Sequence, residues 1–119
     1  MLNFPLLSKR HRLTDDYDFR RVRRLGKALY SPYFIFSYAS SKDPTLLRFG
    51  FIVSNKFDKR AVVRNKYKRL LRSIVEENIS KFKMGYDIVF VLKTEIKNKD
   101  HEEISNYFNK ILSKVSFFG

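Results

Sequence analysis

The sequence predicts an α+β fold, a sandwich in which a sheet of about four strands packs against helices in the order α-β-β-β-α-β-α. Apolar residues recur with the period of a helix near both ends of the chain and in its middle. Continuous apolar and aromatic runs, typical of strands covered on both faces, lie between these segments. The length of 119 residues and the hydrophobic fraction of 44% suit one compact domain, which we expect to span 1–119.

The first helix is expected over 14–24. Thr14 is placed to cap its free amide groups, and Asp15 and Asp16 suit the positive end of the helix dipole. Basic residues occupy its last turn, and Gly26 ends it.

Strands are expected next. A short strand over 27–30 precedes a Ser-Pro interruption, and a strongly aromatic run predicts a strand over 33–38. A turn cluster at 40–44 leads to a further strand over 46–54. Because this link is short, we expect the strands at 33–38 and 46–54 to form an antiparallel hairpin.

The second half alternates helix, strand and helix. A long amphipathic helix begins at Ala61 and is expected to end near 78–80. The most strand-like run of the chain lies at 86–93, and a last helix is expected over 100–115. The apolar stripe of the long helix consists of Val63, Tyr67, Leu70, Leu71, Ile74 and Val75, and that of the last helix of Ile104, Tyr107, Phe108, Ile111, Leu112 and Val115.

The charge is strongly basic and unevenly distributed. The chain has 25 Lys and Arg against 12 Asp and Glu, a formal net charge of +13. Residues 1–75 carry all of this excess, concentrated in blocks at 9–27 and 56–72, whereas 76–119 is neutral. Such a distribution favours a polyanionic partner.

The absence of cysteine excludes a disulfide frame and thiolate chemistry. The absence of a long apolar run or a signal peptide predicts a cytoplasmic protein without a membrane partner.

The long helix places basic side chains on one arc beside its apolar stripe. Arg64, Lys68 and Arg72 form an i, i+4, i+8 row, and Asn65 and Arg69 lie alongside. Like charges at this spacing repel, and a phosphate backbone would relieve the repulsion. The alternative is a solvated basic helix face.

The first helix interleaves basic and aromatic residues, which suits single-stranded nucleic acid. Its members are Tyr17, Phe19, Arg20, Arg21, Arg23 and Arg24. For the ring of Tyr17 or of Phe19 taken alone, packing in the core is the alternative.

The two histidines, His11 and His101, lack metal-ligand spacing, and no glycine-rich phosphate loop occurs. We therefore expect no catalytic centre made of protein side chains and no small-molecule substrate.

Two segments, 53–56 and 61–72, resemble the protein subunit of bacterial ribonuclease P. The second segment reads Ala-Val-Val-Arg-Asn-Lys-Tyr-Lys-Arg-Leu-Leu-Arg. The start of the chain, from Arg12-Leu13 to Gly26, is similar to that family too. The resemblance implies a ribosomal-protein-like fold whose unit over 46–92 has a left-handed crossover, against the general right-handed rule. It also implies two RNA partners, the catalytic ribonuclease P RNA and precursor tRNA, whose 5′ leader is removed by Mg²⁺-dependent hydrolysis. The Mg²⁺ would be bound mainly by RNA and substrate.

The basic block and the resemblance together give the expected site residues. Those expected to bind RNA are Lys56, Arg60, Arg64, Asn65, Lys66, Lys68, Arg69 and Arg72. Those that the resemblance assigns to a leader-binding cleft are Phe19, Arg23, Ile35, Ser37 and Ile52. The chain departs from the family pattern in having Lys66 where arginine is usual, Arg23 in place of an aromatic residue, and no glycine in the loop at 57–60.

Two other functions fit the charge pattern. One is a ribosomal-protein-like structural RNA-binding protein without a leader cleft. The other is a DNA-binding module that uses 61–78 as a recognition helix, although no helix is expected before it at helix-turn-helix spacing.

Overall fold

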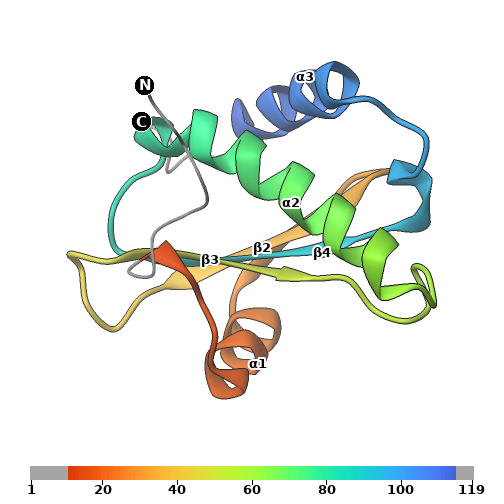
Figure 1. The fold of residues 1–119 in the computed structure, drawn as a ribbon. Coiled ribbons are helices and arrows are strands. Elements are labelled where there is room, and N and C mark those ends of the chain that lie inside the picture. The colour runs from red at the N-terminus through yellow and green to blue at the C-terminus, as the bar shows by residue number, and fades with distance from the viewer. Residues whose placement is uncertain (1–10, 115–119) are drawn as a thin grey trace, which may run out of the picture.

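The computed structural model describes residues 11–114. The elements in chain order are α1 (Asp16–Leu25), β1 (Lys27–Tyr30), β2 (Phe34–Ser40), β3 (Leu47–Ile52), α2 (Ala61–Glu77), η2 (Ile79–Lys81), β4 (Tyr86–Leu92), η3 (Thr94–Ile96) and α3 (His101–Leu112). Helices α2 and α3 cover one face of the sheet, and α1 lies on the other (Figure 1). The α+β architecture and the predicted order of helices and strands are therefore confirmed.

The four strands lie in the order β1-β2-β4-β3. Strand β2 pairs antiparallel with β1 and β4, and β3 pairs in parallel with β4. An isolated parallel bridge also joins Phe49 of β3 to Arg12. The predicted hairpin between 33–38 and 46–54 is wrong, because β4 lies between these strands. A link of about six residues can cross the roughly 10 Å that one intervening strand occupies. Because β4 lies between β2 and β3, both of its edges are paired, and most of its apolar side chains are buried.

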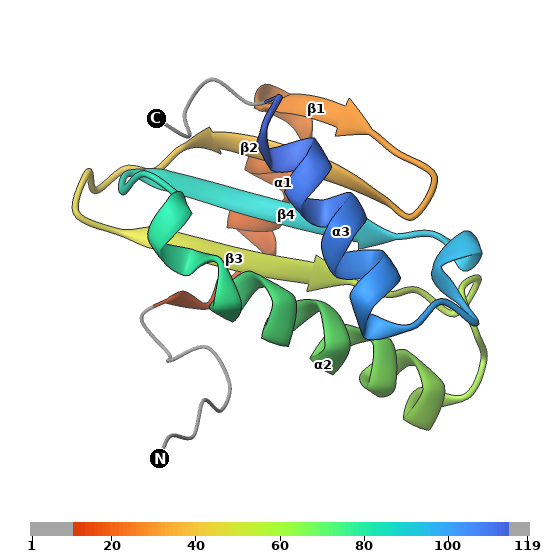
Figure 2. The same cartoon turned by 90° about the horizontal axis from the view of Figure 1, so that it is seen from above.

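The connection from β3 to β4 runs through α2. Seen from the side of α2, with both strands pointing up, β4 lies to the left of β3, so the crossover is left-handed (Figure 2). Nearly all such connections are right-handed. The chain therefore has the exceptional crossover that the resemblance implied.

The main core lies between the sheet and the two helices α2 and α3. Aromatic rings dominate it, and Phe90 stacks against Phe36 and Phe51 at centroid distances of 5.1 and 5.5 Å. The expected stripe of α2 faces this core, with Leu71, Ile74 and Val75 fully buried. A smaller cluster of Leu13, Val22 and Val89 lies on the side of α1.

The helix ends refine the predictions. Asp15, not Thr14, caps α1, because its carboxylate accepts a hydrogen bond from the backbone N–H of Tyr17 at 3.1 Å. Gly26 follows α1 as predicted, and its backbone N–H donates to the carbonyl of Val22. Val115, expected at the end of the last helix, lies outside the described residues.

Candidate nucleic-acid interface

Helix α2 carries most of the residues expected to bind RNA. Asn65, Lys66 and Arg69 are exposed, and Arg64, Lys68 and Arg72 are half-buried; we call these six residues the basic face of α2. Lys56 and Arg60 are exposed on the loop that precedes the helix.

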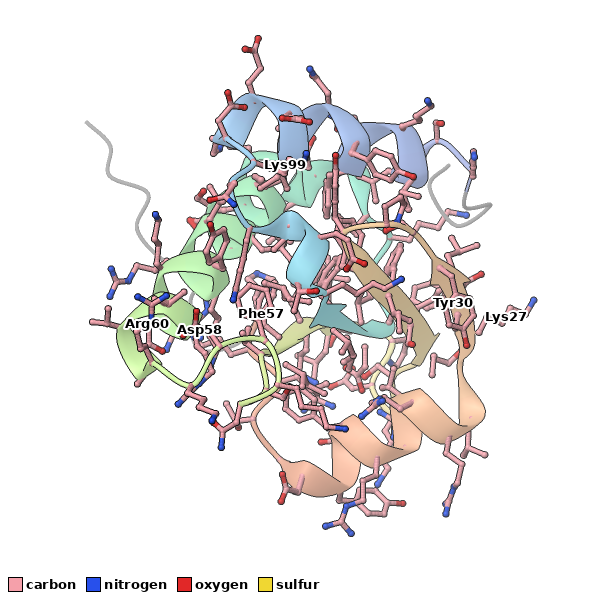
Figure 3. All side chains as sticks on the ribbon, turned by 90° about the vertical axis from the view of Figure 1, so that its right-hand side faces the viewer. Lys27, Tyr30, Phe57, Asp58, Arg60 and Lys99 are labelled. Carbon is pink, nitrogen blue, oxygen red and sulfur yellow. The ribbon has the colours of Figure 1, made fainter. Side chains whose placement is uncertain are left out.

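That loop is held by Asp58. The carboxylate accepts hydrogen bonds from the backbone N–H of Arg60 at 2.9 Å and from the Arg60 guanidinium and Lys97 Nζ at 3.0 Å, on the side of the molecule shown in Figure 3. These bonds, those to Arg60 above all, hold the pKa of Asp58 well below its usual range. Arg64 Nη1 donates to the carbonyls of Asp58 at 3.0 Å and Lys59 at 2.9 Å. The loop is thus ordered without a glycine, and Arg60 already has a carboxylate partner.

The middle of the basic face of α2 has no such partner. Within residues 11–114, no carboxylate forms an ion pair with Lys68, Arg69 or Arg72. Burial, and then the neighbouring cations Arg72 and Arg64, lower the pKa of Lys68. Burial also lowers the pKa of Arg72, whose Nε is buried without a hydrogen-bond partner while its guanidinium lies 5.8 Å from the ring of Phe51. A bound anion would relieve this concentration of positive charge.

A groove lies between α1 and the sheet. Its hollow, of about 440 Å³, is lined by Phe19, Arg20, Arg23, Arg24 and Ile52. A second hollow of about 140 Å³ adjoins it at Phe19 and reaches Lys68 and Arg72 on α2. The ring of Phe19 therefore borders both hollows and connects the groove of α1 with the basic face of α2.

Gly50 of β3 makes room for that ring. A Cβ atom at this position would lie 2.4 Å from Cε1 of Phe19, far closer than two non-bonded carbon atoms approach each other. Phe19 is therefore half-buried over the backbone of β3, with part of its ring still accessible from the groove.

The other residues expected in the cleft lie on the sheet. Register places Ile35 opposite Val91, and Val91 beside Ile52, so these three half-buried side chains share one face. Ser37 points to the same face but is only 5% exposed, which leaves little of it for a ligand. Tyr17 is not among the residues that line the groove, and Lys42 of the β2–β3 connection lies over its ring at 5.0 Å.

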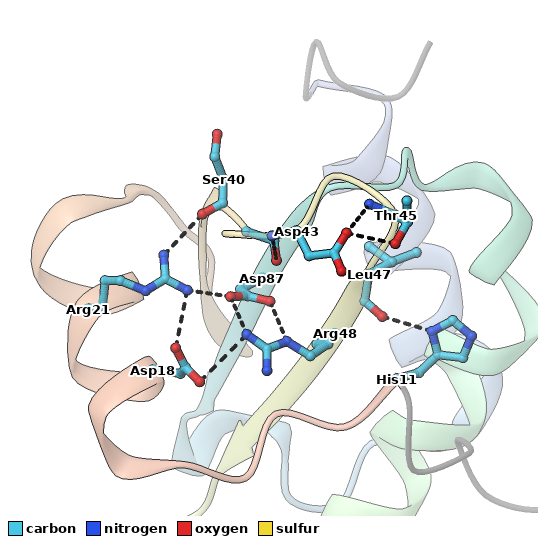
Figure 4. Close-up of polar contacts among 10 residues, drawn as sticks. His11, Asp18, Arg21, Ser40, Asp43, Thr45, Leu47, Arg48 and Asp87 are labelled. Atoms are coloured by element: carbon cyan, nitrogen blue, oxygen red, sulfur yellow. Dashed lines mark hydrogen bonds and ion pairs between the residues drawn. The ribbon is translucent and has the colours of Figure 1, made fainter.

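An ionic network holds α1 on the sheet, and sequence reasoning missed it (Figure 4). Asp87 of β4 is completely buried; it accepts two hydrogen bonds of 2.9 Å from Arg48 and another from Arg21. Asp18 of α1 lies 3.5 Å from both guanidinium groups. Arg21, expected among the basic residues for nucleic acid, is thus engaged within the protein. A lone aspartate inside the apolar run 86–92 was the available signal.

The described residues offer no metal centre. Within 11–114, no group of three or more His, Asp or Glu side chains could hold a metal ion. No helix in this part of the chain is long and apolar enough to cross a membrane. A separate hollow of about 490 Å³, between η2 and the end of α3, contains none of the expected site residues.

Comparisons with known proteins lead to one family. The sequence model of the ribonuclease P family matches residues 7–116. A ribonuclease P protein component from Clostridium botulinum is 33% identical over 111 residues, which cover 92% of this chain and 98% of the relative. The solved RNase P protein of Staphylococcus aureus superposes with a TM-score of 0.82 at 26% identity, covering 93% of this chain and all of that one. That of Thermotoga maritima gives 0.78 at 27% identity, covering 89% and 98%.

Proposed function

The chain belongs to the ribonuclease P protein family, and on that premise we propose that it is the protein subunit of ribonuclease P. It binds the catalytic RNA through the basic face of α2 and the 5′ leader of precursor tRNA through the groove between α1 and the sheet. In doing so it assists removal of the leader, which makes the mature 5′ end of the tRNA. The chain acts as one domain, in the cytoplasm.

One observation carries the proposal: the two surfaces meet at Phe19. The groove of α1 and the hollow that reaches Lys68 and Arg72 share this ring. An RNA strand in the groove would therefore continue directly onto the unpaired cations of α2, where phosphates find positive charge. A base placed against Phe19 would gain stacking energy without sequence-specific hydrogen bonds.

The chemical step belongs to the RNA in this proposal. The described residues include no group of three or more metal-ligating side chains that could hold Mg²⁺ without RNA. The Mg²⁺ of the reaction is held by the RNA and the substrate. The protein contributes position and charge: its cations neutralise phosphates of both RNAs, and its groove directs the leader.

Reconstitution with the cognate RNA tests this function. The wild-type chain should accelerate precursor-tRNA cleavage at low Mg²⁺. A double variant, Arg64→Ala with Arg69→Ala, should lose most of the acceleration. The control, Lys110→Ala with Lys114→Ala, also removes two positive charges, one on α3 and one just after it, and should keep the acceleration. No acceleration by the wild-type chain in matched buffer would contradict the proposal.

Leader dependence separates this function from that of a structural RNA-binding protein. In complex with the RNA subunit, the chain should bind precursor tRNA more tightly than mature tRNA. Equal binding would favour the ribosomal-protein-like alternative. The DNA-binding alternative is disfavoured by geometry, because β3 and a loop precede α2 where a helix-turn-helix would need a helix.

A further inference from the structure

A row of apolar side chains crosses all four strands on the face where α1 lies. Tyr30 of β1 is paired with Ile35, Ile35 with Val91, and Val91 with Ile52. Directly paired residues point to the same face of a sheet. Ile52 and Val91 pack against the cluster that contains Val22 of α1, which identifies the face. We call these four residues the apolar row.

Helix α1 leaves the apolar row partly exposed. The ring of Phe19 lies over Gly50, and Arg21 reaches Asp87, so α1 covers the neighbouring rows of the sheet. The three aliphatic members of the apolar row are half-buried, and Tyr30 is 75% exposed. The row therefore begins at Ile52, which lines the groove, extends its floor across the sheet along the flank of α1, and ends on an accessible aromatic ring.

Basic side chains border this floor on both sides. Arg20, Arg23 and Arg24 line the groove from α1. On the opposite side, Lys93 follows β4 two residues after Val91, and its Nζ donates to the carbonyl of Ser31 at 3.1 Å. Lys93 thus lies at the turn that immediately follows Tyr30. An apolar and aromatic floor between cations is the arrangement that binds single-stranded nucleic acid, with bases on the rings and phosphates on the cations.

We propose that Tyr30 is a base-stacking residue for single-stranded RNA at the β1 end of this groove. The inference rests on the proposed function, in which that RNA is the 5′ leader. Three strand spacings, about 14 Å, separate Tyr30 from Ile52 across the sheet. Figure 3 shows Tyr30 and Lys27 at the edge of the molecule opposite the loop of Asp58 and Arg60. A leader that enters beside Phe19 therefore meets Tyr30 only after it has crossed the sheet.

Leader length supplies the test. The full chain in complex with the RNA subunit is titrated with precursor tRNAs whose leaders grow one nucleotide at a time from none. Tyr30→Ala should match the wild type for short leaders and bind about fivefold or more weakly once the leader reaches β1, because stacking on one ring contributes roughly 1–3 kcal/mol per base. Tyr30→Phe keeps the ring and should restore the affinity. Tyr17→Ala, which removes a 58% exposed ring outside the groove, should change nothing.

The outcomes separate this inference from the function on which it rests. Wild-type preference for long leaders with an unchanged Tyr30→Ala variant overturns the role of Tyr30 alone. A loss that is the same for leaderless tRNA, or that Tyr30→Phe shares, overturns it as well. A wild-type chain indifferent to the leader overturns the proposed function, and this inference with it.

Discussion

Replacing Asp87 by asparagine should destabilise the protein strongly, because this carboxylate is the buried centre of the contact between α1 and the sheet. Its side chain is completely buried and accepts hydrogen bonds from two guanidinium groups. Asparagine keeps the shape but removes the charge, and it turns an amide donor toward groups that can only donate. Arg21 and Arg48 would keep their positive charges with Asp18, 3.5 Å from both guanidinium groups, as the remaining carboxylate of the network.

The structure sets the magnitude. Removing one partner of a buried ion pair costs about 3–5 kcal/mol. The side chains of Arg21 and Arg48 are 12% and 23% exposed, so water can reach part of each guanidinium. We therefore expect a loss near the lower end, about 3 kcal/mol in the free energy of unfolding. For a chain of this length that corresponds to a fall in Tm of roughly 12 °C.

Urea denaturation followed by circular dichroism measures this loss. The midpoint should fall while the slope of the transition stays constant, since the surface exposed on unfolding is unchanged. Glu102→Gln makes the same chemical change at an exposed site on α3 and should leave the midpoint nearly unaltered. If Asp87→Asn lost less than about 1 kcal/mol, the network would not be what holds α1.

Three further changes test other parts of the molecule. Arg69→Ala should lower the dependence of log K on log salt for RNA-subunit binding by about one unit, whereas Lys110→Ala on α3 should not; equal slopes for both would count against the basic face of α2. Gly50→Ala should displace the ring of Phe19 and reduce the preference for leader-bearing tRNA, with RNA-subunit affinity unchanged; equal loss of both would mean that Phe19 acts only in packing. Because folding lowers the pKa of Asp58, its carboxylate stabilises the fold above the unfolded pKa of about 4, and this contribution is lost as the pH falls below that value. Denaturation of wild type and Asp58→Asn at several pH values should therefore show a gap in stability at pH 7 that closes in acid, and a gap that persists unchanged in acid would refute this reasoning.

The helices and strands could be predicted because each is encoded by local periodicity. The apolar stripe through Tyr67 and Leu71 predicts α2, and the continuous run around Phe90 predicts β4. Strand order could not be predicted in this way, because it depends on the insertion of β4 between β2 and β3, and the local sequence does not encode which strands pair. The short link at 41–46 is compatible both with a hairpin and with a step across one strand.

The candidate site was predictable only in part, for a related reason. Helical geometry is enough to group Arg64, Lys68 and Arg72 on one side of α2. Charge alone could not distinguish Arg21, which is held by Asp87, from Arg20, which lines the groove. That distinction depends on a partner 66 residues away along the chain.

The central position of β4 also sets the order of events on the ribosome. Strand β2 can pair with β1 as soon as both are synthesised, but β2 and β3 do not pair with each other. They are joined into one sheet only by β4, which is synthesised after residue 85. Asp87, the anchor of α1, arrives with the same strand. A nascent chain that ends before β4 therefore contains Ile35 and Ile52 but lacks Val91, which lies between them in the sheet, and Asp87, which anchors α1. The groove proposed to bind RNA can therefore form only after residues 86–92 have been synthesised.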